Sequence, residues 1–472
     1  MDATTGPAGP VGDAPSEAPD GVLPRGLTDA LPSLFEKLAR EHRVTGAQLA
    51  LYHDGTLHAH AYGTESVRTG APVTRDTAFP FGSVTKFFTA TLVMQFVSDG
   101  DIDLDEPLTG LLPELRNAPG GSGLGSATVR QLLSHTAGLP DSIDGTDLRG
   151  PSYRRFVAAC AQAPALHTPG LAFSYANTGY CLLGAVVEAA AGMDWWTAMD
   201  SCLLDPLGIT PAYLHDPRPG SGRPARALAD GHAVRPDGAP AEVVDHMTDL
   251  SLAAAGGLTG SAVDLVTAAR LHLDDRAAFA HHHLLPEDEA RLMREPVPGA
   301  EPFGLADAWG LGLMSHRGER GVWYGHDGAV GGASCNLRLH PGSSTALALT
   351  ANSTAGPRLW EALVSELRAI GLDLGHYRLP DPEAPRVTEP GAYFGTYANG
   401  DLHLVVMTGP DGELYLTRED YADYLLTIHT DDRFVARDRE HDGLPIVGRF
   451  VREHPGGPIA LLQYGGRALQ RL

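Results

Sequence analysis

Apolar positions along the chain recur at two spacings, one typical of helices and one typical of strands. Four segments have helical spacing: 27–43, a stretch from about 83 to 100, 180–191 and 360–370. Capping-box patterns add two helix starts, at Thr128 with Gln131 and at Ser261 with Asp264. The chain is therefore expected to be rich in helices up to about residue 370.

Alternating or short apolar runs predict strands in the same part of the chain. These runs are 48–52, 57–62, 322–324, 333–339 and 346–351. Asp54-Gly55 separates the first two and is a typical hairpin turn. Helices and strands mixed without regular alternation predict an α+β fold rather than a doubly wound sheet.

The pattern changes after Leu379. Prolines in 380–390 indicate a linker, and evenly spaced alternating segments follow: 393–397, 402–407, 413–417, 424–429, 433–436, 446–452 and 459–464. Such spacing predicts a small antiparallel barrel or sheet. The expected organisation is a disordered tail over 1–25, a main domain over 26–379, the linker, and a β domain over 391–472.

Charge and composition exclude several classes of function. Lys+Arg 35 against Asp+Glu 58 gives a net charge of -23, which argues against nucleic acid or an anionic membrane as a partner. We find no secretory signal and no apolar run that would span a membrane, so a cytoplasmic location is expected. The four cysteines are scattered, which fits a reducing compartment and predicts no zinc site.

Lysine is scarce, and one of the two lysines follows a serine by three residues. The basic residues are arginines except Lys37 and Lys86, and Lys86 lies in Ser83-Val84-Thr85-Lys86. Arginine cannot lose its proton in a protein, whereas lysine can. A GC-rich genome also depletes lysine, so the scarcity of lysine alone is weak evidence of function. The alternative interpretation of the pair is a capping serine beside a solvated lysine. If the pair is functional, it places a base one helical turn from a nucleophile.

Two further segments contain groups suited to acyl chemistry. Tyr175 and Asn177 lie on a turn that leads into a helix, and His326 and Gly328 lie in a glycine-rich stretch before a strand. A tyrosine can relay protons, an asparagine can hold an amide, and a histidine can bond a carbonyl or assist proton transfer. The alternatives are a core tyrosine, a turn asparagine and a structural histidine.

Ser-x-x-Lys, Tyr-x-Asn and His-x-Gly, in this order, resemble the motifs of the serine β-lactamase and penicillin-binding-protein superfamily. The segments 128–139 and 255–258 are similar to others in that family, and the resemblance covers 27–370. It implies an antiparallel sheet flanked by helices, with an all-helical region. His135, inside the first supporting segment, is expected to be structural.

The resemblance also implies a role for each motif residue. Ser83 would be the acyl-forming nucleophile, Lys86 its base, and Tyr175 the proton carrier. Asn177 would position the acyl chain, and His326 would replace the lysine of the third motif. The substrate and oxyanion side of the site would be formed by the backbone N–H groups of Ser83 and Ala329, with Gly328 and Gly256 beside them.

Within the superfamily, the chain resembles the penicillin-binding-protein-type thioesterases, the stand-alone macrocyclases of nonribosomal peptide synthesis. A histidine at His326 disfavours β-lactamase activity, and the C-terminal domain resembles a lipocalin-like barrel. Arg467 of that domain is a candidate for contacting the substrate. The alternative is a surface arginine on a terminal strand.

The reaction implied by this resemblance is acyl transfer in two steps. Ser83 would take a peptide that ends in a D-residue from a pantetheine thioester on a peptidyl carrier protein. The N-terminal amine of the peptide would then close a macrolactam. No cofactor and no metal is implied. The alternatives are a D-stereospecific peptidase, amidase or esterase on the same site, and an inactive homologue that binds a peptide or lipid.

Overall fold

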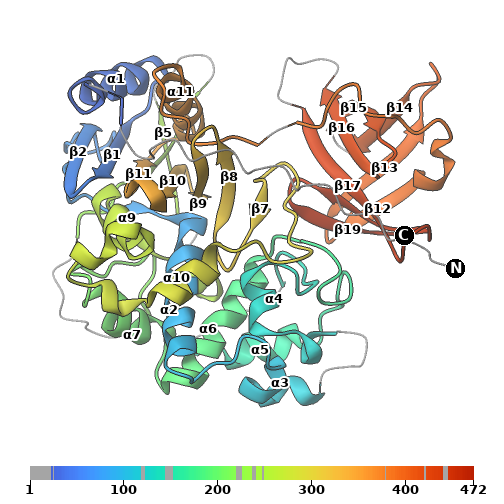
Figure 1. The fold of residues 1–472 in the computed structure, drawn as a ribbon, viewed down its shortest axis with the longest axis horizontal. Helices are drawn as coiled ribbons and strands as arrows, with labels where there is room; N and C mark the ends of the chain where they lie inside the picture. Colours follow the sequence, from blue (N-terminus) through green and yellow to red (C-terminus); the bar gives the residue numbers. More distant parts are fainter. Residues whose placement is uncertain are drawn as a thin grey trace, which may run out of the picture.

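A computed structural model describes residues 23–24, 26–117, 123–143, 152–218, 226–235, 241–246, 249–377, 379–418, 421–438 and 445–472. The expected disordered tail, 1–25, lies outside these residues except for positions 23 and 24. The described chain forms a domain of helices and one large sheet, with a barrel beside it (Figure 1). No helix in the described ranges is long and apolar enough to cross a membrane.

The sheet of the main domain has seven antiparallel strands in the order β2-β1-β11-β10-β9-β8-β7. The strands are β1 (Gly46–His53), β2 (Thr56–Gly63), β7 (Ala308–Trp309), β8 (Met314–Gly318), β9 (Gly321–Val330), β10 (Ala333–His340) and β11 (Thr345–Ala351). Alternate residues of β1 belong to two separate hydrophobic cores, one on each face of the sheet. Leu49 and Leu51 pack on one face, and Ala50 and Tyr52 pack on the other. The sheet is therefore covered on both sides.

Helices from both ends of the main domain cover one face of the sheet. Helix α1 (Leu27–Glu41) packs against α11 (Gly356–Ala369), and both bury leucines on that face. On the other face, α9 (Ala262–Ala269) packs against β1 and β11. Below it in Figure 1 lies the helical region. This arrangement leaves the helical region beside one face of β9 and β10.

Helix α2 (Thr85–Ser98) runs through the interior of the helical region. It is apolar on almost every side, which is typical of a helix buried all round. Its neighbours include α6 (Asn177–Ala191) and α8 (Ala253–Gly256). The remaining helices and small sheets are α3 (Leu108–Leu111), α4 (Val129–Leu133), α5 (Arg154–Cys160), α7 (Trp195–Ala198), α10 (Glu287–Arg294), β3 (Phe79–Pro80) paired with β6 (Thr259–Gly260), and β4 (Gly231–Ala233) paired with β5 (Glu242–Val244).

The C-terminal domain is a closed antiparallel barrel of eight strands. The strands are β12 (Gly395–Asn399), β13 (Leu402–Thr408), β14 (Leu414–Arg418), β15 (Tyr421–Ile428), β16 (Arg433–Asp438), β17 (Ile446–Arg452), β18 (Ile459–Tyr464) and β19 (Arg467–Arg471). Large side chains such as Tyr397, Phe434 and Phe450 fill the interior. The expected α+β class and the barrel are thus confirmed, and the barrel has one strand more than the seven predicted.

Both predicted capping boxes are confirmed, at Thr128 with Gln131 and at Ser261 with Asp264. Several boundaries differ from the predicted ones, and two of them bear on the site. Helix α6 begins at Asn177, three residues before the predicted start. The strand predicted over 322–324 is β9 and continues to Val330, so the His-x-Gly motif lies inside β9 and also, as predicted, ahead of strand β10. The glycines in 325–328 interrupt the apolar pattern, so the second half of β9 was missed, although close packing against β10 and the Ser83 turn requires glycine there.

Candidate functional site

Ser83 lies in a short 3-10 turn, Gly82–Val84, that runs directly into α2. Gly82 has φ +50°, and a Cβ built on it would lie 2.9 Å from the backbone nitrogen of Ala329. Only glycine permits this conformation and this approach without strain. The turn therefore holds Ser83 against strand β9.

Lys86 is one turn further along the helix and is fully buried. Its Nζ lies 2.7 Å from Asn177 Oδ1, 2.8 Å from the carbonyl oxygen of Ala255 and 3.2 Å from Ser83 Oγ. Burial lowers the pKa of Lys86 from 10.5 to about 7. The amine is therefore neutral in a large fraction of molecules at neutral pH.

A neutral amine in this position is oriented by its neighbours. It has two N–H groups and one lone pair, and the oxygens of Asn177 and Ala255 each accept one N–H. The lone pair is then left for the Ser83 hydroxyl. The arrangement can remove the proton of Ser83, which is the requirement for an activated serine nucleophile.

Tyr175 lies two residues before α6, and Asn177 is the first residue of that helix; both lie beside Lys86. The ring centroid of Tyr175 is 5.0 Å from Lys86 Nζ. Burial raises the pKa of Tyr175 well above its ordinary value, although a hydrogen bond with Ser83 opposes the rise. Tyr175 thus holds its proton at neutral pH. Asn177 donates from Nδ2 to Asp141 Oδ1 over 3.2 Å, which turns its Oδ1 towards Lys86.

His326 lies on β9, with its ring centroid 6.3 Å from that of Tyr175. Its Nδ1 is 2.7 Å from the carbonyl oxygen of Asp327, so Nδ1 carries the proton and donates it. Burial, together with the charge of Lys86, lowers the pKa of His326 to about 3. The ring is neutral, and its buried Nε2 is an acceptor without a hydrogen-bond partner among the described protein groups.

Strand β9 passes close to the backbone of Ser83. A Cβ built on Gly328 would lie 2.9 Å from the backbone nitrogen of Ser83 and would collide with the carbonyl oxygen of Phe81. Glycine is needed there for steric reasons. The backbones of Ser83 and Ala329 are thereby brought together, which is the geometry that two oxyanion donors require.

A pocket with about 90 Å³ of water-accessible space opens beside Ser83. Asn177, Gly256 and Ala329 line it together with apolar side chains, and the exposed side chains of His215 and Asp249 also lie on its lining. A Cβ on Gly256 would lie 3.8 Å from Gly82, which is ordinary contact, so Gly256 leaves space rather than avoiding a collision. The pocket adjoins the nucleophile and is mainly apolar, as substrate pockets usually are.

Comparison with known proteins identifies the family. The "Beta-lactamase" family model matches residues 31–369. "Penicillin-binding protein 4" of Amycolatopsis lactamdurans is 35% identical over 370 residues, which are 77% of this chain and 95% of that protein. The chain belongs to the serine β-lactamase and penicillin-binding-protein superfamily. It is accordingly an enzyme that uses a serine nucleophile for acyl transfer or hydrolysis.

Two solved structures extend the likeness through the barrel. The crystal structure of SurE is 68% identical, with a TM-score of 0.88, and the match covers 94% of this chain and 99% of SurE. The crystal structure of SurE with D-Leu is 66% identical, with a TM-score of 0.85, and the match covers the same shares. The superfamily domain and the barrel therefore occur in the same arrangement in SurE.

In this superfamily member, the barrel contacts the Tyr-x-Asn segment directly. Tyr175 donates its backbone N–H to the carbonyl oxygen of Gly466, over 2.8 Å. Gln463 Nε2 donates to the carbonyl oxygen of Phe173 over 2.8 Å, and the backbone of Ala468 donates to Ser174 Oγ. The turn between β18 and β19 thus supports the segment that carries Tyr175.

Arg467, which was expected to approach the substrate, has a protein partner. Its Nη2 lies 2.9 Å from Asp141 Oδ2, and Asp141 accepts from Asn177 through its other oxygen. Contact of Arg467 with a substrate stays a prediction. Sequence reasoning missed Asp141, because a lone aspartate in a loop carries no motif that would mark it.

His135 packs behind Tyr175 and is fully buried. Its ring centroid is 4.3 Å from that of Tyr175, and its Nδ1 accepts the backbone N–H of Ala176. Its φ of 57° is unusual for a residue other than glycine. These contacts fix the backbone beside Tyr175.

Proposed function

We propose that the enzyme is a stand-alone cyclase of nonribosomal peptides that acts on a peptidyl thioester. The main support for this proposal is the 68% sequence identity to SurE, which extends along nearly the whole chain and includes the barrel. SurE is the surugamide cyclase, a member of the group that the sequence resembles. The structure of SurE with D-Leu supports a D-residue at the acylating end of the peptide.

In the first step, Ser83 Oγ attacks the thioester carbonyl and its proton passes to the neutral amine of Lys86. The N–H groups of Ser83 and Ala329 stabilise the oxyanion. The carbon–sulfur bond of the pantetheine thioester then breaks. Tyr175 supplies a proton to the leaving sulfur and regains one from Lys86, since its ring lies beside that amine.

In the second step, the N-terminal amine of the same peptide attacks the ester on Ser83. Its proton leaves through Tyr175, Ser83 is released with its proton restored, and a macrolactam forms. The neutral ring of His326 has an unpartnered acceptor nitrogen, Nε2, and its centroid lies 6.3 Å from that of Tyr175. A neutral acceptor favours a group with N–H over a carboxylate, which fits an amine nucleophile better than a β-lactam substrate.

The carrier protein, the D-terminated peptide and a cytoplasmic location are parts of this proposal. A linear peptide with a D-residue at its C-terminus, prepared as a pantetheine thioester mimic, tests them in part. The enzyme is expected to give the cyclic peptide, identified by mass spectrometry through the loss of water relative to the linear acid. Linear acid alone, from several D-terminated peptides, would instead identify a D-stereospecific hydrolase.

The pH dependence of acylation follows from the buried amine. Only neutral Lys86 accepts the Ser83 proton, and its pKa is about 7. We expect kcat/KM for an activated ester to fall tenfold per pH unit below that value and to level off above it. Steady-state assays from acidic to mildly alkaline pH measure this profile. An inflection at the ordinary pKa of lysine would contradict the assignment.

Arg467 and Asp141 are expected to shift the pH at which the acylation rate falls, because both change the pKa of Lys86. Burial chiefly sets the pKa of Lys86, while the charge of Asp141 raises it and that of Arg467 lowers it. Arg467→Met therefore moves the inflection to higher pH, and Asp141→Asn moves it to lower pH. Shifts of the same sign in both variants would refute this electrostatic coupling.

A further inference from the structure

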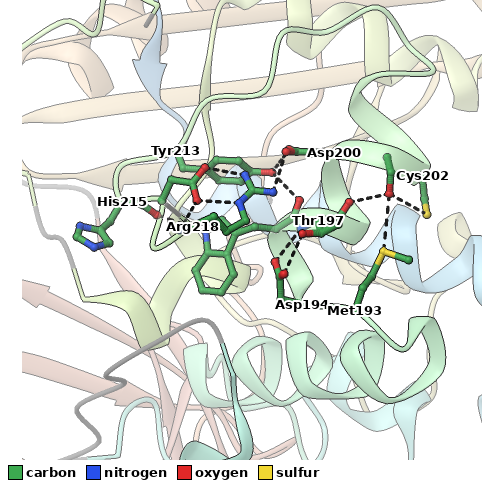
Figure 2. Close-up of polar contacts among 11 residues, drawn as sticks. Met193, Asp194, Thr197, Asp200, Cys202, Tyr213, His215 and Arg218 are labelled. Carbon is green, nitrogen blue, oxygen red and sulfur yellow. Dashed lines mark hydrogen bonds and ion pairs between the residues drawn. The ribbon is translucent and has the colours of Figure 1, made fainter. Parts of the chain in front are cut away.

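Arg218 and two aspartates form a charged cluster beside the loop that carries Leu214 and His215 (Figure 2). Arg218 Nη1 lies 2.9 Å from Asp200 Oδ2. Its Nε and Nη2 lie 2.8 and 2.6 Å from the two carboxylate oxygens of Asp216. Asp200 is only 5% exposed, so these ion pairs are largely shielded from water.

Aromatic residues complete the cluster and attach it to the helices behind. The Tyr213 hydroxyl donates to Asp200 Oδ1, and the Tyr213 ring lies 5.4 Å from the Arg218 guanidinium. Trp196 Nε1 donates to the carbonyl oxygen of His215 over 3.3 Å. Trp196 lies on α7, and Asp200 lies on the π-helical turn Met199–Leu204 that follows it. The loop is therefore fixed to that part of the helical region.

The same loop forms part of the pocket wall beside Ser83. The backbone of Leu214 donates to the carbonyl oxygen of Gly257 over 2.8 Å, and Tyr213 pairs with Leu258 in an antiparallel bridge. Leu214 and His215 both line the pocket. In Figure 2 the His215 ring points away from the charged cluster. The loop thus connects the charged cluster, at Arg218, to the wall of the pocket, at Leu214 and His215.

We propose that Arg218 is a positioning residue that sets the width of the pocket through Leu214 and His215, and so selects the side chain of the residue esterified to Ser83. This inference rests on the proposed acyl transfer, because that reaction places the acyl residue on Ser83 beside the pocket. Leu214, Leu250 and Leu252 line it with apolar groups that suit a branched apolar side chain. Such a side chain depends on contact with the wall, whereas a methyl group does not reach it.

The test compares activated esters whose acyl residue is D-leucine or D-alanine. Arg218→Met keeps an unbranched stem but removes the ion pairs. We expect kcat/KM for the D-leucine ester to fall about tenfold, mainly through KM, with a change of less than about threefold for the D-alanine ester. An unchanged ratio between the two esters, or an equal loss for both, would overturn the proposal.

The barrel provides a matched control. Arg452 lies 2.8 Å from Asp432, which also accepts from the Tyr393 hydroxyl, and the Arg452 guanidinium lies 5.6 Å from the Tyr393 ring. Arg452→Met is expected to lower the melting temperature and to leave the ratio of the two esters unchanged. A change in that ratio as large as that of Arg218→Met would attribute the effect to general loosening of the fold.

A double variant tests whether Arg218 acts through the wall. Leu214→Ala widens the pocket directly, so adding Arg218→Met is expected to reduce kcat/KM for the D-leucine ester no further. Additive losses would contradict the proposal. If Arg218→Met does not fold, Tyr213→Phe replaces it, because it removes one hydrogen bond of Asp200. If the wild-type enzyme turns over neither ester, the proposed function fails; selectivity retained in Arg218→Met refutes only the positioning role.

Discussion

Replacement of Lys86 by arginine is expected to slow acylation of Ser83 by roughly 10³-fold or more, although the positive charge is kept. Arginine cannot give up its proton, so it cannot accept the proton of Ser83. Lys86→Met removes the amine at nearly the same volume and is expected to give a comparable loss. Burst kinetics with an activated ester measure the acylation rate of each variant.

The other lysine of the chain provides the control for this prediction. Lys37 lies on the exposed side of α1, with its Nζ 4.0 Å from Glu41 Oε1. Lys37→Arg is expected to leave acylation and stability unchanged, because an exposed ion pair contributes little. Circular dichroism verifies that the Lys86 variants are folded. Near-normal acylation in folded Lys86→Arg would refute the assignment of Lys86 as the base.

Tyr175→Phe is expected to lower kcat by roughly 10²-fold to 10³-fold while the fold is retained. The substitution keeps the ring that packs against His135 and Lys86 but removes the hydroxyl beside Ser83. Without that hydroxyl, the proton needed by the leaving group has no carrier. Steady-state turnover of a thioester and of an ester with a better leaving group measures the loss, which should be smaller for the better leaving group.

Tyr180 offers a matched comparison within the same cluster. Its ring centroid is 5.6 Å from Lys86 Nζ, and its hydroxyl donates to the carbonyl oxygen of Leu133 over 3.0 Å. Tyr180→Phe is expected to cost about 1 kcal/mol of stability and to change kcat by less than about threefold. Equal losses of kcat in the two variants would assign Tyr175 a packing role instead of proton transfer.

Local patterns sufficed to predict much of this molecule. The spacing of Ser83 and Lys86 predicted neighbours on one helical face, and the structure has them in contact. Capping boxes and alternating segments depend on residues that are close in sequence, and for this reason the helix starts and the barrel could be predicted. Strand β19 was missed because its five residues follow two glycines and include Arg467 and Arg471.

The rest of the site depends on contacts between distant segments. Asp141 orients Asn177 across 36 positions and meets Arg467 across 326. The turn of β18 and β19 supports Tyr175, and the ion pairs of Arg218 hold a wall of the pocket. None of these contacts leaves a periodic or spaced signal in the sequence, because each is created by the tertiary fold.

The chemistry proposed above requires that Ser83 forms an acyl-enzyme with the help of neutral Lys86. Intact-protein mass spectrometry after brief mixing with a D-terminated peptidyl thioester, followed by proteolytic mapping, tests it most directly. One peptidyl adduct is expected on the proteolytic peptide that contains Ser83, absent from Ser83→Ala and strongly reduced in Lys86→Met. An adduct on another residue, or full product formation by Ser83→Ala, would show that Ser83 is not the nucleophile.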